Sequence, residues 1–529
     1  MEDNRATLVK GALLLALAGL ISKMLSAGYR IPLQNLTGDA GFYIYQEVYP
    51  ILGMATIFGL YGFPSAVSQI TAQQKKRGKS LSLAHFYLPI FSGLALLNGG
   101  LCLLLYDHAD TLAHWIGDPN LEKIYKYAAL VFLLVPFTAL LRGVFQGVGN
   151  MKPTAFSQMG EQLVRVTIII LAAIAVAYGG KSAYTIGLAG ALASIAGSCV
   201  ALVVLGVYFC KHRPVDRSRS NAIPWTYYLR MLVMFGFVSA LNHMVLIVMQ
   251  LADALTLLPG LLNKGFSLQQ AMVEKGVFDR GQPLIQFGSV VGSSFALALV
   301  PALSGKRLDD YYAPVERALA MSFYLSAGAT LGLVMIFRET NVLLFQTDDG
   351  TATLRILAVA IMLSSVAITS ASILQSLGYA IRTACLIALA FVSKWLLNLW
   401  LVPLWGIMGG AVASVLSLAL LSLFVLLVLK RFFPNLRYSR YIRWRAFFAA
   451  AGGMVICLFS AEWLGLCIGL SSRLGLLVYV LLTVAIGAAV YILLLLRLGA
   501  FSEKELAVLP FSRFLIRLQK GERTRGLYD

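Results

Sequence analysis

Charged side chains are scarce in this sequence, at 13% of its 529 residues, and no long hydrophilic domain interrupts it. Soluble globular chains carry about a quarter charged residues. The mean hydropathy is +0.79, and apolar stretches of about 20 residues recur along the whole chain. The scarcity of charge excludes a soluble domain, and the apolar stretches predict an all-α protein that crosses a membrane many times.

Cysteine is also scarce. The six cysteines are scattered in or at the ends of apolar stretches, with no CxxC pair and no His/Cys cluster of metal-ligand spacing. They are expected to be small buried hydrophobes, so no metal site is predicted. His243 stands alone inside an apolar span, where a hydrogen-bonded packing residue is the commoner role. No cofactor is expected, although a coupling ion, H⁺ or Na⁺, stays open.

The familiar catalytic motifs are missing too. The sequence contains no GxxxxGK[ST] phosphate loop, no HExxH and no GxSxG. Their absence argues against an ATP-driven transporter, unless a partner chain supplies the motor, and against common hydrolases. Two acidic stretches, "DHAD" (107–110) and "TDDG" (347–350), fit solvated outer loops better than catalytic acids. The protein is therefore not expected to be an enzyme.

What the sequence does contain is about 14 candidate transmembrane helices, separated by polar or Gly/Pro breaks. The seventh is long enough to include an interfacial turn. The predicted spans are 8–30, 42–70, 82–106, 124–147, 155–178, 183–210, 225–258, 282–304, 312–337, 353–378, 381–400, 402–430, 446–470 and 474–497.

The formal net charge of +19 could suggest nucleic acid, but its distribution indicates otherwise. With the N-terminus inside, the inner segments hold several times as many lysines and arginines as the outer loops. This asymmetry predicts that both termini are cytoplasmic and that the basic loops contact membrane lipids. Asp118 and Gly265 should lie in outer loops, the longest of which spans about 259–281.

An internal repeat is visible. "VFQGVGN" (144–150) resembles "ILQSLGY" (373–379), a cation follows each glutamine by 19 residues, and "GALAS" (190–194) resembles "GAVAS" (410–414). The repeat predicts two parallel six-helix lobes related by a pseudo-twofold axis along the membrane normal. The expected parts are lobes at 1–210 and 225–430, a cytoplasmic linker at 211–224, two extra helices within 431–498, and a basic tail at 499–529.

Six of the charged residues inside the predicted spans are candidate site residues, because charge is costly there. Lys23 and Arg30, seven apart on the first span, lie nearly on one face. Lys23 is deep and needs an anion, a salt bridge or water, whereas Arg30 either faces a cavity or anchors at the outer interface. Glu161 and Arg165, four apart, suit an intrahelical ion pair or a cavity site.

Lys394 has no acidic neighbour on its own helix, so its partner is another helix or a ligand. Asp253 is the clearest acidic candidate, either as that partner or as a ligand for a coupling cation. The cations Lys23, Arg30, Arg165 and Lys394 thus outnumber the acids Glu161 and Asp253. Such a surplus suits an anionic substrate such as a phosphate compound.

Four stretches resemble a known family. They are "LRGVFQGVGNMKPTAFSQMGEQLVRV" (141–166), "GFPSAVSQITAQ" (62–73), "DRGQPLIQFG" (279–288) and "KWLLNLWLVPLWGIMGGAVAS" (394–414). They are similar to the MurJ/SpoVB-type flippases of the multidrug/oligosaccharidyl-lipid/polysaccharide exporter superfamily, and in particular to the stage V sporulation protein B and YabM-like branch.

The resemblance implies fourteen helices, two six-helix lobes and a cationic cavity, in a multi-pass protein of the bacterial plasma membrane. The implied activity moves undecaprenyl-diphosphate-linked saccharides, lipid II among them, and the implied partners are that saccharide and membrane lipids. A monomer is expected, and nucleic acid is not. Lys23 matches a basic position of the family through its "S-[RK]-x-L" context; Arg30 matches another only approximately. The family's tail resembles 501–520, with a capping box at Ser502 and Glu505 and a basic amphipathic stretch on the inner surface.

Two rival functions stay open at this stage. A cation-coupled multidrug antiporter of the same superfamily would be lined by carboxylates rather than by cations. A membrane glycosyltransferase or polymerase would need a catalytic acid and substantial outer loops. The carried headgroup, whether of peptidoglycan, spore cortex, teichoic acid or capsule, is not specified by the sequence, because all these precursors share the diphosphate.

Overall fold

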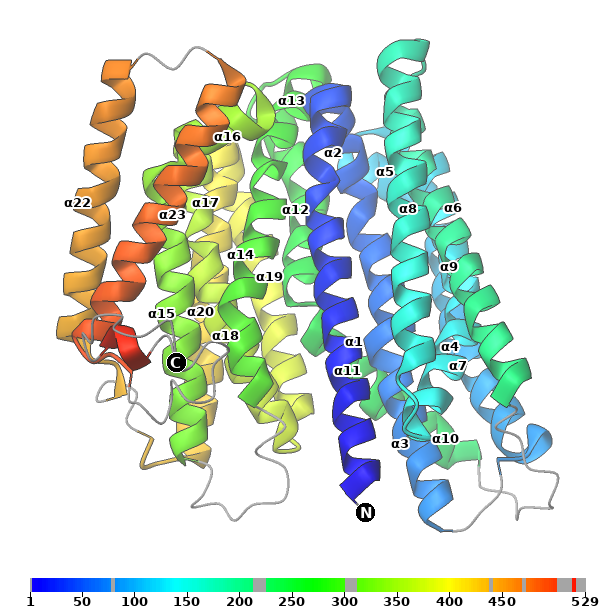
Figure 1. The fold of residues 1–529 in the computed structure, drawn as a ribbon. Coiled ribbons are helices and arrows are strands. Elements are labelled where there is room, and N and C mark those ends of the chain that lie inside the picture. Colours follow the sequence, from blue (N-terminus) through cyan, green and yellow to red (C-terminus); the bar gives the residue numbers. More distant parts are fainter. Residues whose placement is uncertain are drawn as a thin grey trace. The chain divides into compact units, whose positions relative to one another are not determined.

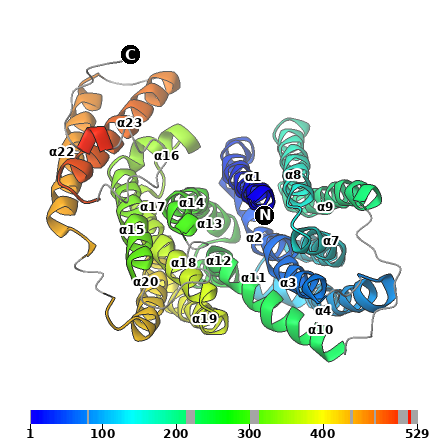
Figure 2. The same ribbon diagram turned by 60° about the horizontal axis from the view of Figure 1, so that its bottom comes forward.

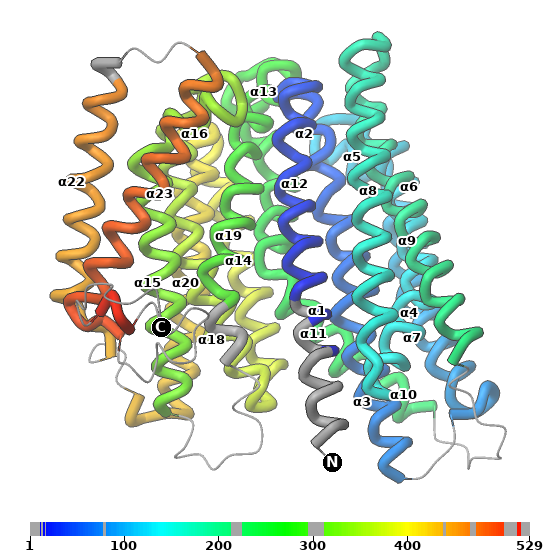
Figure 3. Tube along the Cα trace, viewed as in Figure 1, coloured from blue at the N-terminus to red at the C-terminus, as the bar shows by residue number. Residues whose placement is uncertain are grey.

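The computed structural model describes residues 2–77, 81–212, 225–299, 312–436, 441–468, 472–501 and 516–519 (Figure 3). Side chains are described except at 2–10, 12, 13, 16, 295–299 and 466–468. This part of the chain is almost wholly helical and contains no strand, which confirms the predicted all-α membrane class. The predicted capping box at Ser502 and Glu505 and most of the linker 211–224 lie outside the described residues.

The fold divides into two compact units, each described here by itself. Unit 1 comprises Met1–Pro283 with Tyr379–Ser417, and unit 2 comprises Leu284–Gly378 with Leu418–Asp529. These units are defined by packing. The lobes expected at 1–210 and 225–430 are defined by the sequence repeat, and they stay a prediction.

Most of the described polar side chains that are buried belong to unit 1. Its elements are α1 (Glu2–Gly28), α2 (Arg30–Ile57), the π-helix η1 (Phe58–Gly62), α3 (Phe63–Lys76), the π-helix η2 (Leu83–Tyr87), α4 (Leu88–Asp107), α5 (Ala109–Ile116), η3 (Pro119–Leu121), α6 (Glu122–Leu130), η4 (Val131–Leu133), α7 (Val135–Gly147), α8 (Lys152–Gly179), α9 (Tyr184–His212), α10 (Trp225–Met231), the π-helix η5 (Leu232–Phe237), α11 (Val238–His243), α12 (Val245–Asn263), α13 (Leu268–Asp279) and α19 (Ala380–Trp405).

Unit 2 contains α15 (Tyr312–Met335), α16 (Phe337–Phe345), α17 (Thr351–Ala358), α18 (Ala360–Ser376), α22 (Trp444–Ile468) and α23 (Arg473–Arg497). Two helices, α14 (Gly281–Leu299) and α20 (Ile407–Phe432), cross the boundary between the units in sequence. Figure 1 shows the last two long helices, α22 and α23, running beside each other.

Tyrosines join the helices of unit 2. The Tyr491 hydroxyl donates to the backbone carbonyl of Tyr324 at 2.8 Å, and the Tyr324 hydroxyl accepts from the Arg443 amide at 2.8 Å. Gly328 lets the Tyr491 ring approach, since a Cβ there would lie 2.5 Å from the ring. Buried tyrosines need such hydrogen-bond partners, so these contacts fix α23 against α15.

Twelve helical stretches of the described chain are long and apolar enough to cross a membrane. One of them, Leu17–Lys76, has 60 residues. A straight helix of that length would measure about 90 Å, about three times the thickness of the hydrocarbon core. The stretch is not straight, because Gly38 inside it is non-helical, with φ 68° and ψ −178°. It therefore covers the second predicted span and most of the first. The count of fourteen stays a prediction.

The seventh predicted span, 225–258, is interrupted as expected from its length. Its helix breaks at Met244, between α11 and α12, and α12 continues to Asn263. The outer loop expected at 259–281 is largely helical: Ser267 caps α13 through a capping box with Gln270. This helix was not predicted, because a polar stretch between two spans is usually a connection, although the Ser-x-x-Gln box marks a helix start.

Small residues bring α3 and α7 into close contact. A Cβ at Gly143 would lie 2.5 Å from the Cβ of Val67, and one at Gly147 would lie 2.5 Å from the Cβ of Thr71. This is the small-xxx-small packing that membrane helices use in place of a hydrophobic driving force. Arg142, the neighbour of Gly143, donates to the Gly59 carbonyl of η1 and to Ser157 and Glu161 of α8.

Close packing at a small residue also joins α8 to α9, which run side by side in Figures 1 and 2. A Cβ at Gly197 of α9 would lie 2.7 Å from the backbone oxygen of Glu161 of α8. The same Cβ would lie 3.2 Å from Cγ of Glu161, so the Glu161 side chain begins beside α9. Helices α1 and α2 also contact α8.

The two copies of the sequence repeat have the same local geometry. Gly149 and Gly378 both adopt a left-handed conformation, with φ 87° and 89°. Each donates its amide to the carbonyl of the repeated glutamine, Gln146 at 2.9 Å and Gln375 at 3.0 Å. Glycine is favoured here because a Cβ disfavours positive φ. The local match supports a genuine repeat.

Candidate functional site

Lys23 lies in α1 of unit 1 and is exposed, although the helix around it is apolar. Its surroundings come from other helices. It interacts electrostatically with Tyr49 of α2 and His243 of α11, and the His243 ring stacks on Tyr61 at 4.8 Å between ring centroids. No carboxylate pairs with Lys23 in the described part of the chain. Its ammonium is therefore available to an anion.

His243 also has a defined neighbour. It is exposed and stacked on Tyr61, so the ring contact accounts for its position. One turn before Lys23, a Cβ at Gly19 would lie 3.7 Å from the Tyr61 hydroxyl and 3.9 Å from Nε2 of Gln158. Polar groups from α1, η1, α8 and α11 thus gather around Lys23.

Arg30 is fully buried at the start of α2, so it does not anchor at the outer interface, one of the two roles considered for it. Its guanidinium lies 3.8 Å from the centroid of the Tyr49 ring, a cation–π contact. Tyr29 and Tyr45, joined by a hydrogen bond between their hydroxyls, lie nearby. None of the three guanidinium nitrogens has a hydrogen-bond partner in good geometry among the described residues. A buried cation surrounded by aromatic rings alone is costly.

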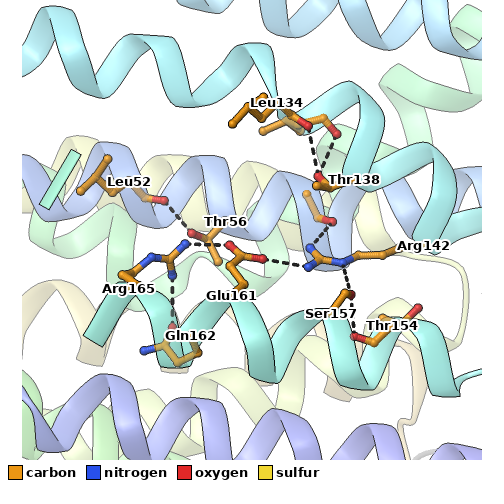
Figure 4. A network of polar contacts seen from close by, with 12 residues as sticks. Leu52, Thr56, Leu134, Thr138, Arg142, Thr154, Ser157, Glu161, Gln162 and Arg165 are labelled. Carbon is orange, nitrogen blue, oxygen red and sulfur yellow. Dashed lines mark hydrogen bonds and ion pairs between the residues drawn. The ribbon is translucent and has the colours of Figure 1, made fainter. Parts of the chain in front are cut away.

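Glu161 holds two arginines, as Figure 4 shows. Its Oε1 accepts from Arg165 at 2.7 Å on the same helix, and its Oε2 accepts from Arg142 of α7 at 2.8 Å. The predicted intrahelical pair is confirmed, and Arg142, which sequence reasoning left out of the site, is the second partner. Arg142 also donates to the Ser157 hydroxyl at 3.1 Å and to the Gly59 carbonyl at 3.0 Å. The cluster carries a net charge of +1 and ties α7, α8 and η1 together.

Lys394 pairs with Asp253, the first of the two roles considered for that carboxylate. The Lys394 ammonium lies 2.6 Å from Oδ2 of Asp253. The Asn398 amide donates to Oδ1 at 3.1 Å, and the Gln282 amide to Oδ2 at 3.4 Å. Both carboxylate oxygens are thus occupied, and a cation bound there would have to displace Lys394.

A second group of ionisable residues lies on α2 and α13 and was not anticipated. Lys275 lies 2.7 Å from Oε1 of Glu47 and 3.0 Å from Oδ2 of Asp279. Close by, Arg280 forms an ion pair with Asp39 at 2.5 Å. Lys275 and Asp279 are four residues apart, a spacing that indicates an ion pair on one helix face, but this stretch was expected to be a loop.

Asp118 was expected in an exposed outer loop, and this is wrong. Its side chain is fully buried, and it accepts hydrogen bonds from the Tyr184 hydroxyl at 2.9 Å and from the Tyr43 hydroxyl at 3.3 Å. The chain turns inward here because Asp118 caps the short helix η3 through the Asn120 amide. Gly265 is exposed, as expected.

These residues enlarge the set of buried charges inferred from the sequence. The described buried cations are Arg30, Arg142, Arg165, Lys275, Arg280 and Lys394, and the described buried acids are Glu47, Asp118, Glu161, Asp253 and Asp279. The buried side chains thus carry a surplus of one positive charge, and the exposed Lys23 raises it to the two expected. What distinguishes the region is that Lys23 and Arg30 lack a carboxylate partner among the described residues, whereas Arg165 and Lys394 have one.

The cysteines differ from the expectation that they are buried. Of the five with described side chains, all of them free, Cys102 is buried, Cys457 is half-buried, and Cys199, Cys210 and Cys385 are exposed. In the described part of the chain no cluster of His, Cys, Asp and Glu could hold a metal ion.

The acidic residues Asp110 and Asp348 are 59% and 55% exposed and pair with His114 and Arg338. Both are exposed as predicted, but Asp110 lies in helix α5 and not in a loop. The neighbouring Asp110 carbonyl and carboxylate raise the pKa of His114.

Comparison with known proteins gives the family. The family described as polysaccharide biosynthesis protein matches residues 8–305. The uncharacterized membrane protein YabM of Bacillus subtilis (strain 168) is 38% identical over 432 residues, which cover 79% of this chain and 80% of YabM. Stage V sporulation protein B of the same organism is 25% identical over 448 residues, 79% of this chain and 83% of that protein.

A shorter match and two solved structures agree with these relatives. The lipid II flippase MurJ of Bacillus subtilis (strain 168) is 28% identical over 218 residues, 39% of this chain and 40% of MurJ. A lipid II flippase MurJ structure in an inward closed conformation has a TM-score of 0.64 at 11% identity, covering 90% of this chain and 98% of that one.

An inward-facing multidrug-resistance MATE family transporter has a TM-score of 0.55 at 13% identity, covering 77% of this chain and 93% of that one. These two structural matches show a shared fold. Because the family matches residues 8–305 and YabM is 38% identical over most of the chain, the protein belongs to the polysaccharide biosynthesis protein family, as a MurJ/SpoVB-type member of the multidrug/oligosaccharidyl-lipid/polysaccharide exporter superfamily.

Proposed function

We propose that the protein is a flippase for an undecaprenyl-diphosphate-linked saccharide of the bacterial cell envelope. It would move this lipid from the inner to the outer leaflet of the plasma membrane by alternating access, acting as a monomer with both termini in the cytoplasm. No covalent bond is made or broken in this process, so the protein would not be an enzyme.

The observation that carries the proposal is the pair of interior cations without a carboxylate partner among the described residues. Arg30 is fully buried against Tyr49, and Lys23 is exposed next to Tyr49 and His243. A buried guanidinium needs a counter-charge, and a diphosphate supplies one with several acceptor oxygens. Lys23 and Arg30 are the residues proposed to bind it.

Arg165 and Lys394 take a secondary part in this proposal. Glu161 and Asp253 already neutralise them at 2.7 Å and 2.6 Å, so a ligand would have to compete with a carboxylate at contact distance. Glu161 and Asp253 are therefore assigned to structural ion pairs. These pairs hold the helices on which the binding residues lie.

A cation-coupled multidrug antiporter is the second candidate. The buried carboxylates Glu47, Asp118 and Asp279 favour it, since carboxylates suit cationic drugs and coupling ions. The similarity in fold to a MATE family transporter is compatible with both functions. The availability of Lys23 and Arg30 favours the flippase, because a cationic drug would be repelled by both.

The test is reconstitution of the full chain in liposomes with several undecaprenyl-linked substrates, each scored for translocation between leaflets. The same preparation is assayed for accumulation of cationic dyes, and a deletion strain is profiled for drug sensitivity. Translocation of a diphosphate-linked lipid without dye transport would support the flippase. Dye transport, with no diphosphate-linked lipid moved, would refute it in favour of the antiporter.

A further inference from the structure

Two carboxylates share one ammonium between α2 and α13. Lys275 lies 2.7 Å from Glu47 and 3.0 Å from Asp279, and the three side chains are 1%, 0% and 4% exposed. With all three ionised, this triad carries one uncompensated negative charge. Burying such a charge costs several kcal/mol unless it is neutralised.

The tyrosines around the triad supply hydrogen-bond donors and no positive charge. The Tyr125 hydroxyl of α6 lies 3.5 Å from Oε2 of Glu47, and Lys275 lies 5.2 Å from the centroid of the Tyr43 ring. Tyr43 donates in turn to Asp118, which adds a second uncompensated carboxylate nearby. The hydroxyl of Tyr184 in α9 is also taken by Asp118. The surroundings therefore increase the charge imbalance of the triad.

The remaining charged neighbours neutralise one another. Asp253 of α12 and Lys394 of α19, which both act electrostatically on Asp279, form their own ion pair at 2.6 Å. Arg280, next in sequence to Asp279, is engaged by Asp39 at 2.5 Å. Neither pair has a positive charge left to neutralise the triad. The uncompensated negative charge of the triad must therefore be neutralised by something that the triad binds.

The geometry distinguishes a proton from a metal ion. The Lys275 ammonium already occupies the position between the two carboxylates, where a sodium ion would have to lie, and it would repel one. A proton on a carboxyl oxygen needs no additional space, and it leaves a neutral group made of one carboxylate, one ammonium and one carboxylic acid. Consistent with this, no metal-binding cluster is found in the described residues.

We propose that the Glu47–Lys275–Asp279 triad binds one exchangeable proton, shared by its two carboxyl groups, and that this proton is the ion coupled to transport. The coupling part rests on the proposed function; the proton site does not. The proton bonds to a lone pair of a carboxylate oxygen when α2 and α13 are packed together. It leaves for water when the two helices separate and both carboxylates become hydrated.

The electrostatics of Asp279 agree with this. Burial raises its pKa to about 6, against the opposing effect of Lys275, and Asp253 raises it further. The packed arrangement thus binds the proton roughly a hundredfold more tightly than a hydrated aspartate does. The packed arrangement binds more protons than the separated one, so low pH stabilises it. This stabilisation falls as the pH rises from about 4 toward 6.

Infrared difference spectroscopy of the purified full chain during a pH titration tests the site without any substrate. The wild type should show the carbonyl stretching band of a protonated carboxyl group that disappears with a midpoint near pH 6. Glu47→Gln and Asp279→Asn should each remove or shift that band. Glu122→Gln, which alters an exposed carboxylate paired with Lys126, should leave it unchanged.

The wild-type titration is repeated with sodium replaced by choline, so the result does not depend on whether the variants fold. A band of the same midpoint in both salts supports the proton site. The absence of a titrating band, its persistence in both variants, or a midpoint that moves with sodium would overturn it.

The coupling is tested separately in liposomes, with a pH gradient imposed across the membrane. Translocation by the wild type should respond to the gradient, and Asp279→Asn should lose most of that response while Glu122→Gln keeps it. An infrared band without translocation of any lipid would contradict the proposed function and keep the proton site. Translocation that is indifferent to the gradient in the wild type would overturn the coupling.

Discussion

Replacing Glu161 by Gln would remove the only carboxylate that holds Arg142 and Arg165 in the described structure. The two guanidiniums are 2% and 11% exposed and lie 2.8 Å and 2.7 Å from the two oxygens of Glu161. After the substitution, Arg142 would keep the Ser157 hydroxyl and the Gly59 carbonyl, whereas Arg165 would keep Gln162 at 3.2 Å. Two buried cations would then lack a counter-charge.

Removing one partner of a buried ion pair costs about 3–5 kcal/mol, because an uncompensated charge stays behind. We expect Glu161→Gln to lower the free energy of unfolding by about this amount, at the lower end if water reaches Arg165. The measurement is reversible unfolding of the purified protein in mixed micelles, followed by circular dichroism. Expression and monodispersity are recorded in parallel.

The matched control is Glu122→Gln in α6. Glu122 also forms an ion pair four residues along its helix, with Lys126 at 2.5 Å, but both side chains are 37% exposed. Exposed pairs contribute only about 0–1 kcal/mol, so this variant should be close to wild type. If Glu161→Gln were no more costly than Glu122→Gln, the Arg142–Glu161–Arg165 cluster would not be a stabilising network, and the argument from burial would be refuted.

Three further predictions concern binding, packing and topology. Lys23→Arg should keep much of the translocation rate. Lys23→Gln should lower that rate about tenfold to a hundredfold at equal amounts of folded protein, since a charge-assisted contact contributes about 1.5–3 kcal/mol. A wild-type rate for the glutamine variant would remove Lys23 from the site. Gly276→Ala would place a Cβ 2.1 Å from the backbone oxygen of Asp39 in α2, so it should destabilise the protein by about 1–3 kcal/mol. Gly99→Ala, with open space around it, should not, and thermal unfolding of the two variants would show the difference. A cysteine at the exposed Gly265 should react with a membrane-impermeant thiol reagent on intact cells and one at the exposed Lys76 should not; the reverse pattern would contradict the positive-inside assignment.

Much of the architecture follows from local sequence. Apolar stretches of about 20 residues have one stable form in a membrane, the helix, so the membrane class could be predicted from composition and length. The Glu161–Arg165 pair could also be predicted, since residues four apart share a helix face. The repeated Gln and Gly gave the two left-handed turns at Gly149 and Gly378, because positive φ favours glycine.

The partners of the other charges were decided only by tertiary structure. Glu161 pairs with Arg142, 19 residues away, and Lys394 with Asp253, 141 residues away, and neither separation follows from helix periodicity. Lys275 meets Glu47 because α13 packs on α2, and a helix in place of the expected loop made this contact possible. A single sequence shows which charges lie within apolar spans. Which of them are neutralised depends on helix packing, and among the described site residues it is Lys23 and Arg30 that have no carboxylate partner.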